Sequence, residues 1–164
     1  MRQSHQSPDL PSIASNLIGI ANAHWSRREY PEAIDNTQRA LVIRESIVPS
    51  NEASVAATLA MLGNIYQDSG NIGLALDLCR KALVLFERTL SADSPIIAEL
   101  FYSMGTMQLD TDLIDDAYHS FERVVRIYRK ILPQGHPDRI AAENDLRRVI
   151  HLHQKKMKRL QQQS

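Results

Sequence analysis

Residues Val55 to Leu90 read VAATLAMLGNIYQDSGNIGLALDLCRKALVLFERTL, and this stretch decides the fold. Its first half carries residues at spacings of three and four that share one helical face: Leu59, Leu62, Gly63 and Tyr66. After the turn signal at residues 68–71, Ala75, Cys79 and Ala82 repeat that spacing. Since Gly63 and these alanines are small enough for two helices to approach closely, the stretch predicts a pair of antiparallel helices.

Side chains of similar size and polarity recur 42 residues before and 42 residues after the positions in this stretch. The matching columns are Leu17, Leu59 and Phe101; Ile20, Leu62 and Met104; Ala21, Gly63 and Gly105; Ala33, Ala75 and Ala117; and Ala40, Ala82 and Val124. A fixed period of this length is typical of a solenoid, in which each unit buries its apolar face by stacking on its neighbours. The sequence therefore predicts an all-α, right-handed superhelix of three antiparallel helix pairs.

The predicted boundaries follow from prolines and turn residues. We expect a disordered N-terminal segment over residues 1–9, three repeats over about 10–51, 52–93 and 94–136, and a capping helix with a basic tail over 137–164. Ser94 and Pro95 read as the N-cap and first turn of a helix. In the last helix, Glu143 and Arg147 occupy slots that are apolar or small in the repeats, so we expect this helix to cap the solenoid.

Composition narrows the class of protein. The chain has 164 residues, a net charge of zero and one cysteine, and it holds no apolar run long enough for a membrane span. With a single cysteine and no secretory signal, a reduced, cytoplasmic setting is expected. The six histidines are scattered, and no phosphate loop, HExxH, GxSxG or CxxC motif is present. We therefore expect no catalysis, no cofactor, no metal and no small-molecule substrate.

The repeats resemble those of tetratricopeptide repeat proteins. The resemblance rests on Leu59, Leu62, Gly63 and Tyr66, followed by Ala75, Cys79 and Ala82, and it covers about residues 11–138. The usual period of this family is about 34 residues, whereas the 42-residue period and the LP-x-x-HPD linker at residues 132–138 resemble kinesin light chain. His24 and Gln108 depart from the Tyr66 slot, and the paired asparagines of kinesin light chain are absent, so its cargo chemistry does not carry over.

The resemblance implies that the first helix of each pair lines a concave face that binds a peptide or a partner helix. That face should hold Ile18, Asn22 and Trp25; Ala60, Asn64 and Gln67; and Tyr102, Thr106 and Leu109. Asn22 and Asn64 lie where the family often places an asparagine that grips peptide backbone, and a side-chain amide both donates and accepts. Trp25 and Tyr102 are the expected apolar anchors, although a tryptophan in this position more often packs at the end of its helix.

Several alternatives stay open at the level of sequence. The carboxylate clamp of chaperone-binding relatives is rejected, because Ile18 and Ser103 stand where cations are needed and Glu99 would repel a carboxylate. Two copies could pair through an incompletely capped end, with the N-terminal edge favoured. The basic tail over residues 147–164 has six cations and no acid, and could bind nucleic acid or an anionic surface, but it lacks interleaved aromatics.

Overall fold

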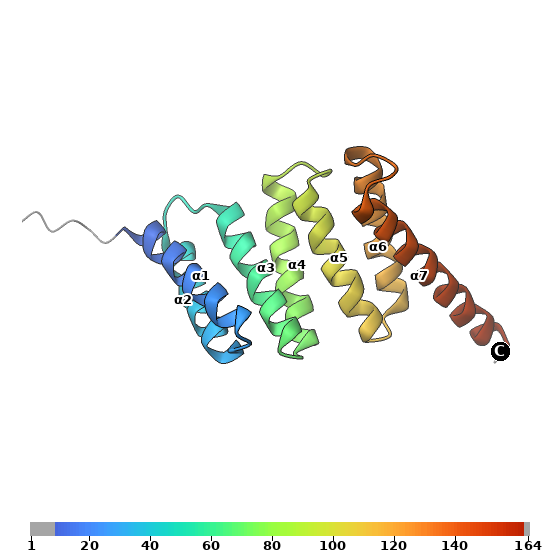
Figure 1. Ribbon diagram of the computed structural model, residues 1–164, viewed down its shortest axis with the longest axis horizontal. Helices are drawn as coiled ribbons and strands as arrows, with labels where there is room; N and C mark the ends of the chain where they lie inside the picture. Colours follow the sequence, from blue (N-terminus) through green and yellow to red (C-terminus); the bar gives the residue numbers. More distant parts are fainter. Residues whose placement is uncertain (1–8, 163–164) are drawn as a thin grey trace, which may run out of the picture. The chain divides into compact units, whose positions relative to one another are not determined.

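The computed structural model describes residues 9–162, and within this range the chain is entirely helical apart from turns (Figure 1). The helices are α1 (Leu10–Ser26), α2 (Tyr30–Ser46), α3 (Glu52–Asp68), α4 (Ile72–Thr89), α5 (Pro95–Asp110), α6 (Ile114–Ile131) and α7 (Pro137–Gln162). They fall into two compact units that divide after Thr89. The three predicted helix pairs and the additional last helix are all present.

The first unit is built from two helix pairs. α1 packs against α2, α3 packs against α4, and α2 packs against α3. The small residues that the 42-residue period places in register form its interior, and all are fully buried: Ala21, Ala33, Ala40, Ala75, Cys79 and Ala82. In these columns the 42-residue period marks buried positions, because the slots lie where one helix meets the next. In the column of Leu62 and Met104, by contrast, Ile20 is 48% exposed.

Gly63 is the point of closest approach between α3 and α4. A Cβ atom built on it would lie 2.9 Å from Cys79 Sγ and 3.2 Å from the backbone oxygen of Ala75. Real Cβ atoms essentially never lie 2.9 Å from another atom, and 3.2 Å is tighter than most real Cβ contacts, so any larger residue here requires the Cys79 side chain and α4 to shift. The small residue predicted at this slot is thus required by contact with the partner helix.

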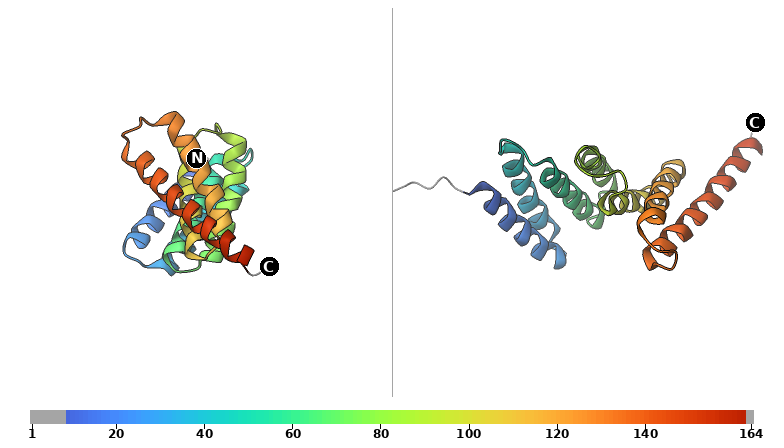
Figure 2. Two further views of the ribbon diagram at one scale, coloured as in Figure 1. Left: turned by 90° about the vertical axis from the view of Figure 1, so that its right-hand side faces the viewer. Right: turned by 90° about the horizontal axis from the view of Figure 1, so that it is seen from above.

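The second unit is centred on Phe121. This ring is fully buried in a cluster with Ile114, Ala117 and Val149, and Gly105 on α5 leaves the space that the ring fills. α5 and α7 both contribute to the cluster, and α6 contacts each of them. In the two further views of Figure 2, α7 (red) lies beside α6 (orange). With 26 residues, α7 is longer than the 16-residue and 18-residue helices α5 and α6.

The helix ends agree with the sequence in most places. The turns of the three pairs each contain a residue with positive φ, namely Arg28 at 61°, Gly70 at 89° and Asp112 at 59°. Glycine suits this conformation best, yet only the second pair has it. Ser94 is the N-cap of α5 as predicted, but its side chain makes no capping hydrogen bond. Asp9 instead caps α1 by accepting from the Ser12 amide at 3.4 Å, while the rest of the predicted 1–9 segment lies outside the described residues.

Candidate functional site

Asn22 on α1 and Asn64 on α3 lie one repeat apart in the first unit. Asn22 is exposed and Asn64 is half-buried. Within residues 9–162, neither side-chain amide has a hydrogen-bond partner from the chain. Both amides are therefore available to donate to and accept from a ligand, which is what the predicted backbone contact requires.

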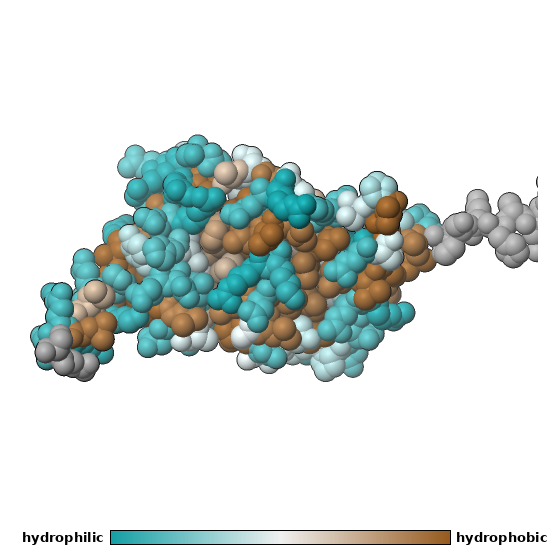
Figure 3. Space-filling view, turned by 180° about the vertical axis from the view of Figure 1, so that it is seen from behind, coloured by the Kyte–Doolittle hydropathy of each residue, from teal (hydrophilic) through white to brown (hydrophobic). Residues whose placement is uncertain are grey.

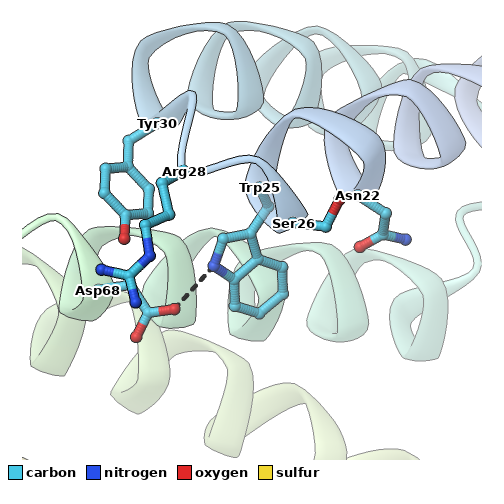
Figure 4. Close-up of a pocket in the computed structure, with 6 residues that line it drawn as sticks. All are labelled: Asn22, Trp25, Ser26, Arg28, Tyr30 and Asp68. Atoms are coloured by element: carbon cyan, nitrogen blue, oxygen red, sulfur yellow. Dashed lines mark hydrogen bonds between the residues drawn. The ribbon is translucent and has the colours of Figure 1, made fainter.

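Trp25 lines a surface hollow next to Asn22. The indole Nε1 donates a hydrogen bond of 2.8 Å to Asp68 Oδ2, which joins the end of α1 to the end of α3. The hollow measures about 530 Å³, and Figure 4 shows its six lining residues. They are Asn22, Trp25, Ser26, Arg28, Tyr30 and Asp68.

The predicted concave-face residues include Asn22 and Trp25 of this hollow but neither of its two charged residues, Arg28 and Asp68. In Figure 4, the side chains of Arg28 and Asp68 come toward each other on one side of the Trp25 ring. Arg28 reaches the hollow because the turn between α1 and α2 takes a positive φ at this residue. Asp68 is the last residue of α3. The hollow thus combines a flat aromatic wall with one group of each charge.

The remaining predicted residues of the first unit lie on α1 and α3 as well. Ile18 is half-buried and packs against the core of the first pair formed by Ala14, Leu17 and Ala40. Ala60 and Gln67 are half-buried on α3. Their use by a ligand stays a prediction, with Gln67 the polar member of the two.

Two of the three predicted residues of the third repeat, Tyr102 and Leu109, pack in the cluster to which α7 contributes. The Tyr102 hydroxyl donates a hydrogen bond of 2.7 Å to Asp145 Oδ2, and the ring meets Phe121 edge-on with 5.5 Å between centroids. Leu109 packs on the same cluster. The Thr106 hydroxyl donates to the backbone oxygen of Ser103. Tyr102 is therefore held by the last helix, so any role as an anchor would require a ligand to compete with α7.

The Tyr102–Asp145 bond spans the same number of residues as the Trp25–Asp68 bond, although the two bonds use different slots of the repeat. Trp25 and Asp68 are separated by 43 residues, and so are Tyr102 and Asp145. Each bond joins the first helix of a pair to the helix that opens the next unit of the pattern. α7 therefore follows the register of a fourth first-position helix, even though Glu143 and Arg147 break its apolar pattern.

The pKa of Tyr102 is raised to about 12, chiefly by the hydrogen bond to Asp145 and to a smaller extent by burial. Because the folded pKa lies above the ordinary value near 10, this bond stabilises the fold fully below pH 10 and is lost as the pH rises through 12. We expect Tyr102→Phe to lower the free energy of unfolding by about 1 kcal/mol at pH 7. Urea unfolding at pH 7 and pH 11.5 should show this difference shrinking; a difference that grows with pH would contradict it.

The basic tail is partly neutralised within the second unit. Lys156 Nζ lies 2.7 Å from Asp115 Oδ2, and His153 Nε2 lies 3.2 Å from Asp115 Oδ1. The Lys156 hydrogen bond lowers the pKa of Asp115. The acidic first turn of α6 therefore faces Lys156 and His153 of α7, and Lys156 would have to leave Asp115 before it contacted a phosphate.

Catalytic and metal-binding groups do not gather in the described chain. Cys79 is fully buried, and burial raises its pKa to about 11, which disfavours the thiolate that a nucleophile needs. Residues 9–162 contain no group of three or more His, Cys, Asp or Glu side chains placed to hold a metal ion. No helix in this range combines the length and apolar character of a membrane span.

Comparison with known proteins agrees with the repeat geometry. Residues 54–130 match the family model described as Tetratricopeptide repeat. Residues 54–130 are tetratricopeptide repeats. The repeats of the chain are similar to those of the Arabidopsis thaliana protein kinesin light chain-related 2, with 23% identity over 137 residues, which covers 84% of this chain and 20% of that protein. The chain spans about a fifth of the length of the curated relatives it matches.

Solved structures share the tetratricopeptide fold. A structure from Podospora anserina, described as kinesin light chain repeats that are nearly identical to one another, matches with a TM-score of 0.74 and 22% identity. The match covers 85% of this chain and 66% of that one. The first tetratricopeptide domain of Spaghetti, solved bound to the HSP90 peptide SRMEEVD, matches with a TM-score of 0.64 and 15% identity, covering 92% and 98%. The all-α repeat fold is thus confirmed. Tetratricopeptide repeats are generally non-catalytic scaffolds for protein–protein interaction.

Proposed function

We propose that this chain is an interaction scaffold that holds an extended peptide segment of a partner protein along α1 and α3. The observation that carries the proposal is the pair of side-chain amides of Asn22 and Asn64, which lack hydrogen-bond partners in the described chain. An extended peptide presents backbone N–H and C=O groups that lose water on binding and need new partners. Two amides at the repeat spacing supply both donors and acceptors to it.

The hollow beside Asn22 supports a side-chain contact in addition to the backbone contacts. Trp25 offers a rigid aromatic wall, which is a frequent anchor in protein interfaces. Its Nε1 is fixed by Asp68, so little rotamer freedom is lost when a ligand packs on the ring. Arg28 and Asp68 at the rim can each meet a charge of opposite sign. The backbone contacts would thus give affinity, and the hollow would select one side chain of the peptide.

The test is a quantitative pull-down from lysate with the intact chain and the double variant Asn22→Ala/Asn64→Ala. Each lost hydrogen bond costs about 0.5–1.5 kcal/mol, so a partner held through both should be bound about 5-fold to 160-fold more weakly. Asn16→Ala/Asn36→Ala is the matched control, because it removes two asparagines from α1 and α2 that occupy other slots. Equal retention of the same partners by the parent and the Asn22/Asn64 variant would refute the proposal.

A second candidate is pairing of two copies through the outer edge of α1. Ile13 and Ile20 are 38% and 48% exposed, whereas Val55 and Leu62, in the same slots of α3, are 7% and 3% exposed. α2 packs against α3. In Figure 3, hydrophobic side chains reach the surface at the right-hand, N-terminal end of the described chain.

A second copy would cover this edge with an identical apolar edge about a two-fold axis. Light scattering on the intact chain should then give the mass of a dimer, and Ile13→Glu/Ile20→Glu should give the mass of a monomer. A parent that stays monomeric at high concentration would exclude this candidate.

A further inference from the structure

Arg44 stands in a slot that the other two repeats fill with a buried aromatic residue. Counting 42 residues on from Arg44 reaches Phe86, and another 42 reaches Tyr128. Those two side chains are only 4% and 8% exposed. The first repeat therefore has a guanidinium group at a position where the other repeats have an aromatic ring. Because this position is partly buried, the guanidinium loses part of its hydration.

The residues that contact Arg44 also differ from the residues 42 positions later in the chain. Arg44 Nη1 donates to the backbone oxygen of Ser54 at 3.0 Å and to Thr58 Oγ1 at 2.6 Å. The residues 42 positions after Ser54 and Thr58 are Ile96 and Leu100, which are both apolar. A cation and two polar side chains thus replace a set of apolar ones at the junction between α2 and α3.

The positive charge of Arg44 has no counter-charge. Both acceptors of Nη1 are uncharged, and no carboxylate in residues 9–162 forms an ion pair with this side chain. Glu45, the next residue in the chain, is exposed and forms no ion pair with Arg44. Asp9 caps α1, and Glu52 Oε1 lies 3.0 Å from Arg88 Nη2. Burial lowers the pKa of Arg44, and no neighbouring acid offsets this effect. A partly desolvated cation of this kind is stabilised when it meets an anion.

A cavity of about 160 Å³ opens beside the guanidinium. Its lining residues are Pro11, Ser15, Arg44, Ile47, Asn51 and Ser54. Pro11 and Ile47 supply apolar walls, and Ser15 and Ser54 supply hydroxyl groups. The volume admits a group of a few heavy atoms, and the planar guanidinium matches the geometry of a carboxylate.

We propose that this cavity binds a carboxylate, supplied as an aspartate or glutamate side chain of an acidic partner segment, with Arg44 as its counter-ion. Because Nη1 is held by Ser54 and Thr58, the guanidinium is fixed in orientation and its Nε and Nη2 donors remain for the ligand. The site shares no residue with the Asn22 and Asn64 surface. A failure of the proposed peptide contact along α1 and α3 would therefore leave this proposal unaffected, and the reverse also holds.

The test is a nuclear magnetic resonance titration of the ¹⁵N-labelled intact chain with N-acetyl-aspartate N-methylamide. The expected result is a saturable shift, with a millimolar dissociation constant, confined to resonances of the cavity residues. The uncharged asparagine analogue should produce no such shift. Inorganic phosphate is titrated in parallel, and binding of phosphate without binding of the carboxylate probe would overturn the assignment.

Two variants connect the shift to the guanidinium. Arg44→Phe restores the residue type of the other repeats and should abolish the shift; if it does not fold, Arg44→Gln serves the same purpose. Arg39→Gln is the matched control, because it removes a 63% exposed arginine from the same helix and should leave the shift unchanged. Retention of the carboxylate-induced shift after loss of Arg44, or its loss in the Arg39 variant, would overturn the proposal.

Discussion

Phe121→Ala is expected to lower the free energy of unfolding of the second unit by about 3–5 kcal/mol. The ring is fully buried between α5 and α7. The cost should fall in the upper part of this range, because Gly105 has no side chain that could move into the space that the ring leaves. Val149 and Tyr102 lose their main contact at the same time, so α7 should detach first.

Thermal unfolding and amide hydrogen exchange measure this effect together. Exchange in residues 142–153 should accelerate more than exchange in α3 and α4, which lie in the other unit. Phe121→Leu is the matched control, since it keeps most of the apolar volume and should cost clearly less. A Phe121→Ala variant within about 1 kcal/mol of the parent would contradict the role assigned to this ring.

Gly63→Val is expected to cost about 2–3 kcal/mol, in the upper part of the range for overpacking. The added Cβ would meet Cys79 Sγ at 2.9 Å and the Ala75 backbone oxygen at 3.2 Å. A side chain can turn aside, but the backbone oxygen belongs to α4 and moves only if that helix moves. Adding Cys79→Ala should therefore recover only part of the loss.

Gly19→Ala is the control for Gly63→Val. Gly19 lies in the middle of α1, and a Cβ built on it meets nothing within 4 Å. Alanine is the better helix former by about 0.5–1 kcal/mol, so this change should stabilise the first unit. Chemical denaturation of the three proteins checks both signs. If Gly63→Val also stabilised the chain, the close approach of α3 and α4 would be excluded.

The helices and their packed faces could be predicted because burial in a repeat protein is periodic. Ala33, Ala75 and Ala117 share one column, and all three are fully buried. The same reasoning placed Gly63 and Gly105 at close helix contacts, where the structure has them. Each column gives three residues that occupy equivalent positions in the fold. Three apolar or small residues in one column are therefore stronger evidence for a buried position than one such residue in a single helix.

The contacts between successive repeats could not be predicted in the same way. Trp25 and Asp68, like Tyr102 and Asp145, are joined only because helices one repeat apart bring their side chains together. These pairs do not recur at the 42-residue spacing, so the columns carry no signal for them. Arg44 is the opposite case, since its departure from an aromatic column was readable in the sequence but its lack of a counter-charge required the structure.

The candidate site is consequently better defined in the first unit than in the second. Asn22 on α1 is exposed, and Trp25 on α1 and Asn64 on α3 are half-buried, whereas Tyr102 and Leu109 pack in the cluster that holds α7. An end helix that caps a solenoid must cover apolar surface, and here that surface includes residues which the family pattern places on the concave face. We therefore centre the proposed peptide contact on the first unit.

Hydrogen exchange with a bound partner tests the central claim most directly. The measurement uses a partner that the parent retains and the Asn22→Ala/Asn64→Ala variant loses, and compares the intact chain with and without it. The account predicts slower exchange along α1 and α3, in residues 18–25 and 60–67, and unchanged exchange on the outward faces of α2 and α4. Protection confined to α2, α4 or the basic end of α7 would contradict it.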